Sequence, residues 1–274
     1  MLKKILSIVL AVVMIVSVAA FATSCGNTAG DNNSETTVAD NKANDGKEFK
    51  VGFIFLHDEN STYDLNFINA VKGAQAATGL TDSQVIMKTN IPEGQECYEA
   101  CEDLVDQGCS LIFADSFGHE TYLIEAAKKY TDVQFCHATG TRAHTEGLSN
   151  YHNAFASIYE GRYLAGVAAG LKLNEMIANG DFTAEQAVIG YIGAYTYAEV
   201  VSGYTSFFLG ARSVCPTATM KVQFTGSWYD EAMEKEAANA LIAQGCKLIS
   251  QHADSMGAPT ACETAGVPDV SYNG

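Results

Sequence analysis

The sequence predicts an α/β protein made of two doubly wound, parallel-sheet lobes of like topology around a cleft. Three observations lead to this fold class. Short apolar runs alternate with amphipathic helical patterns, as in parallel sheets that carry helices on both faces. The alternation is completed once and restarts at Ala187. The third strand of each strand–helix series lies in nearly the same sequence, "QGCSLIFADSFG" from Gln107 to Gly118 and "QGCKLISQHADSMG" from Gln244 to Gly257.

The first pass begins with a β-rich apolar run, "FKVGFIFL", and continues with a helix whose apolar residues recur at helical spacing. Pro92 stands near the start of the next helix and Gly108 at its end, which are the usual places for these residues. The predicted strands are 49–56, 84–89, 110–115 and 133–139, and the predicted helices are 64–78, 92–108 and 120–131.

The second pass is joined to the first near Tyr151–Ala156 and opens with a helix at 156–177. Gly166 and Gly170 are four residues apart in this helix, and charged and polar neighbours favour close helix packing over a membrane contact. The remaining predicted strands are 187–194, 220–226, 247–252 and 269–274, and the remaining predicted helices are 198–214, 230–245 and 257–266.

The N-terminus has the pattern of an export signal. Lys3 and Lys4 precede an uncharged apolar stretch, and small residues lead to Cys25. Residues 1–24 are therefore interpreted as a lipoprotein signal peptide, with Cys25 as the lipidated residue; a transmembrane anchor is the alternative. Residues 25–47 hold too few large apolar side chains to fold and are interpreted as a tether. This leaves 48–153 for the N-terminal lobe and 154–274 for the C-terminal lobe, and places the protein on the extracytoplasmic face of the cell membrane.

The acidic charge argues against several classes of partner. The net charge is −16, and loss of the leader with its two lysines would make it −18. Such a surface repels phosphate backbones, so we expect no nucleic-acid partner and disfavour nucleotides as ligands.

The cysteines do not indicate a disulfide framework or a metal site. Eight cysteines less Cys25 leave seven, which cannot all pair within the chain. Cys97 and Cys101 fall on the apolar face of a helix, which favours small buried hydrophobes over a disulfide or a metal pair. No zinc spacing, G-x-S-x-G elbow or phosphate loop occurs in the sequence. We therefore expect no metal, no cofactor and no catalytic residue.

In doubly wound sheets, ligands bind beyond the carboxyl ends of the strands, so polar and aromatic residues just after each strand are the candidates. Asp64, Asp115 and Asp254 each precede a helix and could instead be caps. Trp228 could be a core residue, but its Gly-Ser turn favours a stacking platform. Asp230 could cap the helix that follows it, and Lys235 could face solvent. The candidate ligand-binding residues are Tyr63, Asp64, Asn66, Asp115, Ser116, Phe117, Tyr197, Glu199, Trp228, Asp230, Lys235, His252 and Asp254.

Four segments resemble the BMP (basic membrane protein) family: "NYHNAFASIYEGRYLAGVAAG", "AEVVSGYTSFFLGARSVCP", "TGSWYDEAMEKEAANALIAQGCKLISQHADS" and "FADSFGHE". The resemblance covers about 48–274. It implies the type I periplasmic-binding fold, an ABC permease as partner, and a purine nucleoside or purine base as ligand. The position of Lys235 resembles a basic position of the family. Family members continue beyond the strand at which this chain stops, so we expect the C-terminal part of the second lobe to be missing.

The leading hypothesis is a lipid-anchored, extracytoplasmic substrate-binding protein of an ABC importer, not an enzyme. The alternatives are a sugar or amino-acid receptor or a sensor of the same fold, and a nucleoside hydrolase.

Overall fold

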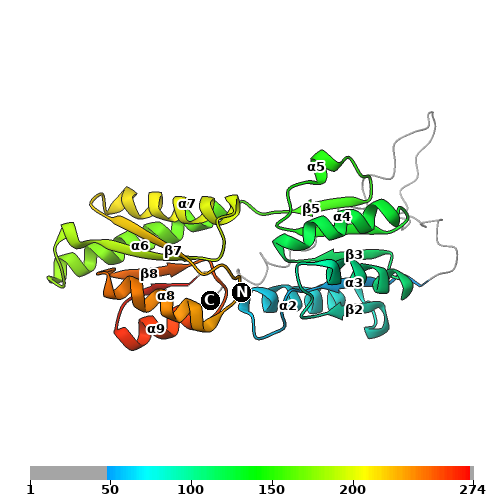
Figure 1. Cartoon of the computed structure of the whole chain (residues 1–274), viewed down its shortest axis with the longest axis horizontal. Helices are drawn as coiled ribbons and strands as arrows, with labels where there is room; N and C mark the ends of the chain where they lie inside the picture. Colours follow the sequence, from blue (N-terminus) through cyan, green and yellow to red (C-terminus); the bar gives the residue numbers. More distant parts are fainter. Residues whose placement is uncertain (1–47, 272–274) are drawn as a thin grey trace, which may run out of the picture.

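The computed structural model describes residues 48–271, which form two lobes (Figure 1). The predicted leader, Cys25 and the tether lie outside the described residues. Each lobe contains one parallel sheet with helices on both faces, so the predicted fold class is confirmed. The first sheet has the order β2-β1-β3-β4-β5 and the second β7-β6-β8-β9, so their first four strands follow the same winding. The strands are β1 (Val51–Ile54), β2 (Val85–Lys88), β3 (Leu111–Ala114), β4 (Gln134–Ala138), β5 (Tyr151–Ala154), β6 (Val188–Gly193), β7 (Thr219–Phe224), β8 (Leu248–Gln251) and β9 (Asp269–Val270).

The α-helices fall where the apolar periodicity predicts them, except for a short helix at 143–146 that was not predicted. The first lobe has α2 (Thr62–Thr78), α3 (Gln95–Asp106), α4 (Glu120–Lys129) and the short α5 (Ala143–Glu146). The second has α6 (Ile158–Asn179), α7 (Ala198–Val214), α8 (Glu231–Ala243) and α9 (Gly257–Ala265). The predicted bounds of α7 agree with the structure at both ends.

β5 was not predicted from the sequence. The segment near Tyr151, interpreted as a connection between the lobes, pairs with β4 in parallel, with Phe135 opposite Tyr151. The neighbouring His152 and Asn153 dilute the apolar strand signal. Tyr151 nevertheless lies in the core and donates its hydroxyl to Glu120 at 3.1 Å. Residues 155–157 then connect the first sheet to α6.

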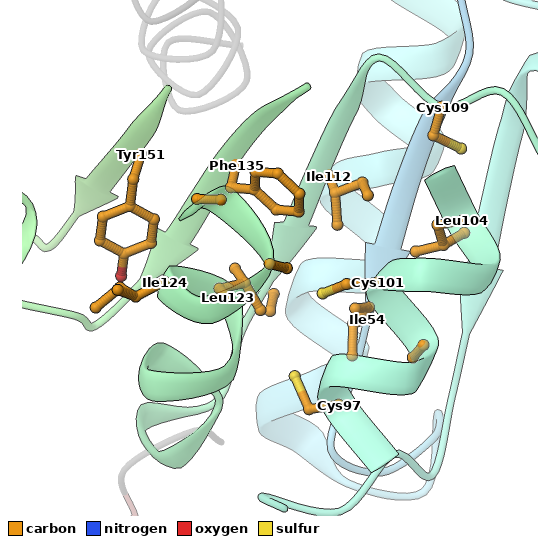
Figure 2. Close-up of a cluster of buried hydrophobic side chains, with 14 residues drawn as sticks. Ile54, Cys97, Cys101, Leu104, Cys109, Ile112, Leu123, Ile124, Phe135 and Tyr151 are labelled. Carbon is orange, nitrogen blue, oxygen red and sulfur yellow. The ribbon is translucent and has the colours of Figure 1, made fainter. Parts of the chain in front are cut away.

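The core of the first lobe lies mainly between its sheet and the pair α3 and α4 (Figure 2). Leu104 and Phe135 are fully buried there. Cys97 and Cys101 join the same cluster as free thiols, and the other cysteines of residues 48–271 are also free. Their interpretation as small hydrophobes is confirmed. Within this range no helix has the length and apolar character needed to cross a bilayer.

The second lobe packs α6 and α7 on one face of its sheet, and α8 and α9 on the other. Three glycines allow α6 and α7 to touch through their backbones. A Cβ built on Gly166 would stand near the Phe207 carbonyl oxygen, and one on Gly210 near the Tyr163 carbonyl oxygen. A Cβ on Gly170 would overlap the Ala211 carbonyl oxygen. Close helix packing, predicted for Gly166 and Gly170, is confirmed.

Candidate ligand-binding site

A cavity lies at the carboxyl ends of both sheets and takes its walls from both lobes. It measures about 410 Å³, a volume that includes space open to solvent. The first lobe contributes segments after β1, β3 and β4, and the second contributes segments after β6, β7 and β8. The lining residues are Leu56, His57, Tyr63, Asp64, Ser116, Phe117 and Thr139 from the first lobe, and Glu199, Trp228, His252 and Asp254 from the second.

The structure brings eight of the thirteen predicted residues into this lining. They are Tyr63, Asp64, Ser116, Phe117, Glu199, Trp228, His252 and Asp254. Tyr63 and Asp64 belong to the first turn of α2, which Ser61 caps by accepting from the Asp64 amide at 3.3 Å. The cap is thus Ser61, and the Asp64 carboxylate is left to accept from the His57 amide at 3.0 Å.

Two further predicted residues contact lining residues without belonging to the lining. Asp115 is buried, its carboxylate accepts from the Leu56 amide at 3.2 Å, and its carbonyl accepts from the Tyr63 hydroxyl at 2.8 Å. Tyr197 stacks on Phe117 with ring centroids 5.0 Å apart. Both residues therefore hold lining residues in place rather than face the cavity.

The other three predicted residues lie outside the lining. Asn66 is exposed on α2 and donates to the Thr62 carbonyl. Asp230 caps α8 by accepting from the Met233 amide at 2.9 Å. Lys235 is exposed on the same helix. Capping and a solvated helix face account for Asp230 and Lys235 in the structure.

The repeated Ala-Asp-Ser text does not place its two aspartates at equivalent positions. Asp115 directly follows β3, and its amide donates to Ile54 of β1. In the second lobe His252 takes that register, because its amide donates to Ile192 of β6. Asp254 comes two residues later, where its amide donates to the Trp228 carbonyl at 2.8 Å. The longer loop after β8 thus gives the second lobe a histidine where the first has a carboxylate.

Leu56, His57 and Thr139 also line the cavity, although none was among the candidates selected. Thr139 carries a signal that sequence alone lacks, a φ of 69°. The left-handed region is unfavourable for a β-branched residue, and such strain is concentrated at functional sites. Its buried hydroxyl has no hydrogen-bond partner among the described residues. Position after β4 was the available sequence clue.

Thr139→Gly is expected to weaken ligand binding without lowering stability. Glycine relieves about 1 to 2 kcal/mol of left-handed strain and costs about 0.5 to 1 kcal/mol in backbone entropy, so the free energy of unfolding should hold or rise slightly. Asn90→Gly is the control, because Asn90 also has a positive φ (59°) but lies outside the lining. Calorimetric titration with adenosine and guanosine, together with urea unfolding, distinguishes the two variants. Equal affinities for both variants would exclude a ligand role for Thr139.

Asp64 and Asp115 form a buried carboxyl pair at the first-lobe wall. Burial and the neighbouring Asp64 charge raise the pKa of Asp115 well above its usual range. Burial also opposes ionisation of Asp64, but hydrogen bonds from His57 and Ser61 outweigh it and lower the pKa of Asp64. As the pH rises, Asp64 therefore loses its proton before Asp115 does, and the Asp64 carboxylate lines the cavity.

Asp115→Asn is expected to stabilise the protein increasingly as the pH rises. The native pKa of Asp115 exceeds its unfolded value of about 3.9, so its contribution is fully favourable below that pH and is lost as the pH rises through the native pKa. Asparagine cannot ionise and still accepts from Leu56. Urea unfolding should show that the free energy of unfolding of the variant, relative to that of the wild type, is higher at pH 8 than at pH 4. The same pH dependence in both proteins would contradict the raised pKa of Asp115.

The second-lobe wall carries a buried Glu199–His252 pair. The Glu199 Oε2 and His252 Nε2 atoms are 3.0 Å apart, with side chains 8% and 3% exposed. Burial lowers the pKa of His252, although the Glu199 hydrogen bond acts in the opposite direction. A neutral imidazole that donates its Nε2 proton to Glu199 fits this arrangement. No lysine or arginine belongs to the lining formed by residues 48–271, so the cavity favours uncharged, hydrogen-bond-donating ligands.

Aromatic side chains of the two lobes contact one another across the cleft. Tyr197 stacks on Phe117 of the first lobe and on Tyr195 of the second, each at 5.0 Å between centroids. The rings of Trp228 and Tyr195 meet edge to face, with their centroids 5.2 Å apart. Met256, which follows Ala-Asp-Ser in the second lobe as Phe117 does in the first, is half exposed and outside the lining. The aromatic surface is therefore built from Phe117, Trp228 and their tyrosine supports.

Comparison with known proteins gives a match to one family model over residues 56–267, described as "ABC transporter substrate-binding protein PnrA-like" (Bmp). A purine-binding protein of Brucella abortus (strain 2308) is 36% identical over 224 residues, covering 81% of this chain and 59% of that protein. A Haloferax volcanii protein assigned as the ABC transporter glucose-binding protein TsgA13 is 40% identical over 163 residues, covering 60% of this chain and 38% of that protein. The chain thus spans less than two thirds of the length of these curated relatives.

Solved structures show the same fold at low identity. An ABC transporter solute-binding protein from Aeropyrum pernix K1 superposes with a TM-score of 0.66 at 17% identity, over 82% of this chain and 61% of that one. One from Conexibacter woesei superposes with a TM-score of 0.60 at 19% identity, over 81% of this chain and 69% of that one.

Proposed function

Because the chain belongs to the Bmp family of ABC transporter substrate-binding proteins, we propose that it captures a purine nucleoside or purine base between its two lobes. The observation that carries this proposal is the composition of the cavity. Phe117 and Trp228 come from opposite lobes, and the carboxylates of Asp64, Glu199 and Asp254 accompany them. A flat heterocycle with ring N–H groups and ribose hydroxyls suits aromatic faces surrounded by acceptors.

The free energies involved indicate that aromatic stacking and hydrogen bonds to the carboxylates must both contribute to binding. Micromolar affinity requires about 8 kcal/mol of binding free energy. One base–aromatic stack supplies about 1 to 3 kcal/mol, and a hydrogen bond to a charged group about 1.5 to 3 kcal/mol. One stack and two or three charged hydrogen bonds reach the required value. Since the carboxylates belong to both lobes, a ligand that contacts them all favours the closed arrangement.

We further propose that the lobes divide in the connection after β5, at residues 155–157, rather than between residues 153 and 154. We also propose that Cys25 is lipidated and holds the receptor on the extracytoplasmic face of the membrane. The closed form would deliver its ligand to an ABC permease. The leader pattern and the family support this proposal, since members of such importer systems bind their substrate outside the cytoplasm.

A sugar is the second candidate ligand, and one observation favours it: the Haloferax relative is assigned as a glucose-binding protein. A cavity lined by aromatic faces and carboxylates also suits a pyranose ring. The two ligand classes differ in what the acceptors must bind, because a purine offers N–H donors, on its ring or its amino group, in the plane of a large π face.

Calorimetric titration of the full chain with adenosine, guanosine, adenine, adenosine monophosphate and glucose tests the proposal. We expect saturable binding of at least one nucleoside or base, weaker binding of the phosphorylated nucleoside because of the cavity carboxylates, and no conversion of the bound compound. Binding of glucose alone would replace the purine by a sugar. Release of free base from a nucleoside would identify a hydrolase instead.

A further inference from the structure

Glu93 lies in the segment between β2 and α3 and contacts both lobes through one carboxylate oxygen. Its Oε1 accepts from the Ser116 hydroxyl at 2.5 Å and from the Gly118 amide at 2.7 Å, both in the loop after β3. The same oxygen accepts from the Trp228 indole Nε1 at 3.2 Å, across the cleft. Glu93 was not among the predicted residues and is not part of the cavity lining.

The neighbourhood of Glu93 is shaped for this contact. A Cβ on Gly118 would stand 2.5 Å from the Glu93 Cδ and 2.7 Å from its Oε2, so the carboxylate can lie against this backbone only because residue 118 is glycine. The segment itself is fixed by the buried His119, whose Nε2 is 2.9 Å from the Ile91 carbonyl oxygen. The acceptor therefore sits at a fixed point on the first-lobe wall.

Trp228 is equally fixed on the second lobe. Its carbonyl accepts from the Asp254 amide at 2.8 Å, and its ring lies against Tyr195. The indole N–H is thus presented to the first lobe by a supported ring. An indole N–H donates and cannot accept, so a carboxylate on the facing lobe is a suitable partner.

We propose that Glu93 is a positioning residue that locks the Phe117 wall and the Trp228 wall of the cavity together when the lobes close. Glu93 Oε1 accepts from the loop after β3 and also from the indole of Trp228. This shared acceptor therefore sets the spacing between the two walls. For its effect on binding, this inference rests on the proposed function. The contact itself involves protein groups alone.

Acrylamide quenching of tryptophan fluorescence tests the lock, because Trp228 is the sole tryptophan of the chain. Without any added ligand, Glu93→Ala should raise the Stern–Volmer constant of Trp228. Glu93→Gln should stay closer to the wild type, since its amide oxygen still accepts one hydrogen bond. Glu96→Ala is the matched control, because Glu96 is an exposed glutamate of the neighbouring helix turn. Gly118→Ala displaces the carboxylate without removing it and should resemble Glu93→Ala.

Loss of the lock should also weaken binding of the tightest purine ligand by about ten-fold, the equivalent of one charge-assisted hydrogen bond. Equal quenching in wild type, Glu93→Ala and Gly118→Ala would overturn the inference, as would an equal rise in Glu96→Ala. A role confined to holding the loop after β3 would not change the exposure of Trp228. Quenching requires no ligand, so it tests the Glu93–Trp228 contact even if the protein binds no purine. Purine binding can likewise be measured even if the contact is absent.

Discussion

Gly166→Ala is expected to lower the free energy of unfolding by about 2 to 3 kcal/mol, although alanine is the better helix former. The added Cβ would overlap the Phe207 backbone on α7, where the nearest atom is a carbonyl oxygen. Neither helix backbone can yield locally, so α6 and α7 must separate. Their separation loosens the core around Leu173 and Phe207, both fully buried between these helices and the second sheet.

Gly161→Ala is the matched control in the same helix. Apart from the backbone of its own helix, no atom of residues 48–271 lies within 4 Å of a Cβ built there, so this variant should gain up to about 1 kcal/mol from helix propensity. Urea unfolding of both variants therefore predicts shifts of opposite sign. A shift of the same sign and size in both would show that α6 and α7 are not in backbone contact.

Phe117→Ala is expected to weaken purine binding about 10- to 100-fold, because it removes a stacking surface worth about 1 to 3 kcal/mol. The ring lines the cavity on the first-lobe side and is held by Tyr197 of the second lobe. Its loss removes a contact to the ligand and also one between the lobes. Calorimetric titration with the tightest nucleoside or base measures the effect.

Phe208→Ala is the control for this experiment. Phe208 lies on α7 beside Arg212 and outside the lining, so its removal should leave the affinity unchanged. Unfolding curves for both variants establish that each remains folded. An unchanged affinity in Phe117→Ala would remove the first-lobe aromatic wall from the account.

The fold was predictable because apolar periodicity is a local property. Strands such as β6 and helices such as α7 are continuous apolar or amphipathic segments, and the echo at Gln107 and Gln244 marks the third strand of each sheet. β5 was missed because its two central residues, His152 and Asn153, are polar and interrupt the apolar pattern. Asn153 satisfies its amide in the Tyr151 and Glu120 network, which is tertiary and leaves no trace in local sequence.

The candidate site was predictable to the level of loops. Residues after β1, β3, β6, β7 and β8 do converge, as parallel winding requires. Whether a side chain faces the cavity depends on register, and this was not predictable: Asp115 and Asp254 share a motif but differ in position after their strands. Glu93 and Thr139 depend on a contact between lobes and on a backbone angle, so neither has a sequence signature.

The most direct test of a purine held between the lobes is a fluorescence titration of Trp228 in the full chain with adenosine and guanosine. The sole indole lines the cavity on the second-lobe side, so a stacked purine must alter its emission. We predict a saturable change with at least one nucleoside and no change with glucose. Saturable binding of the nucleoside by calorimetry with unaltered Trp228 emission would place the purine elsewhere and contradict the account.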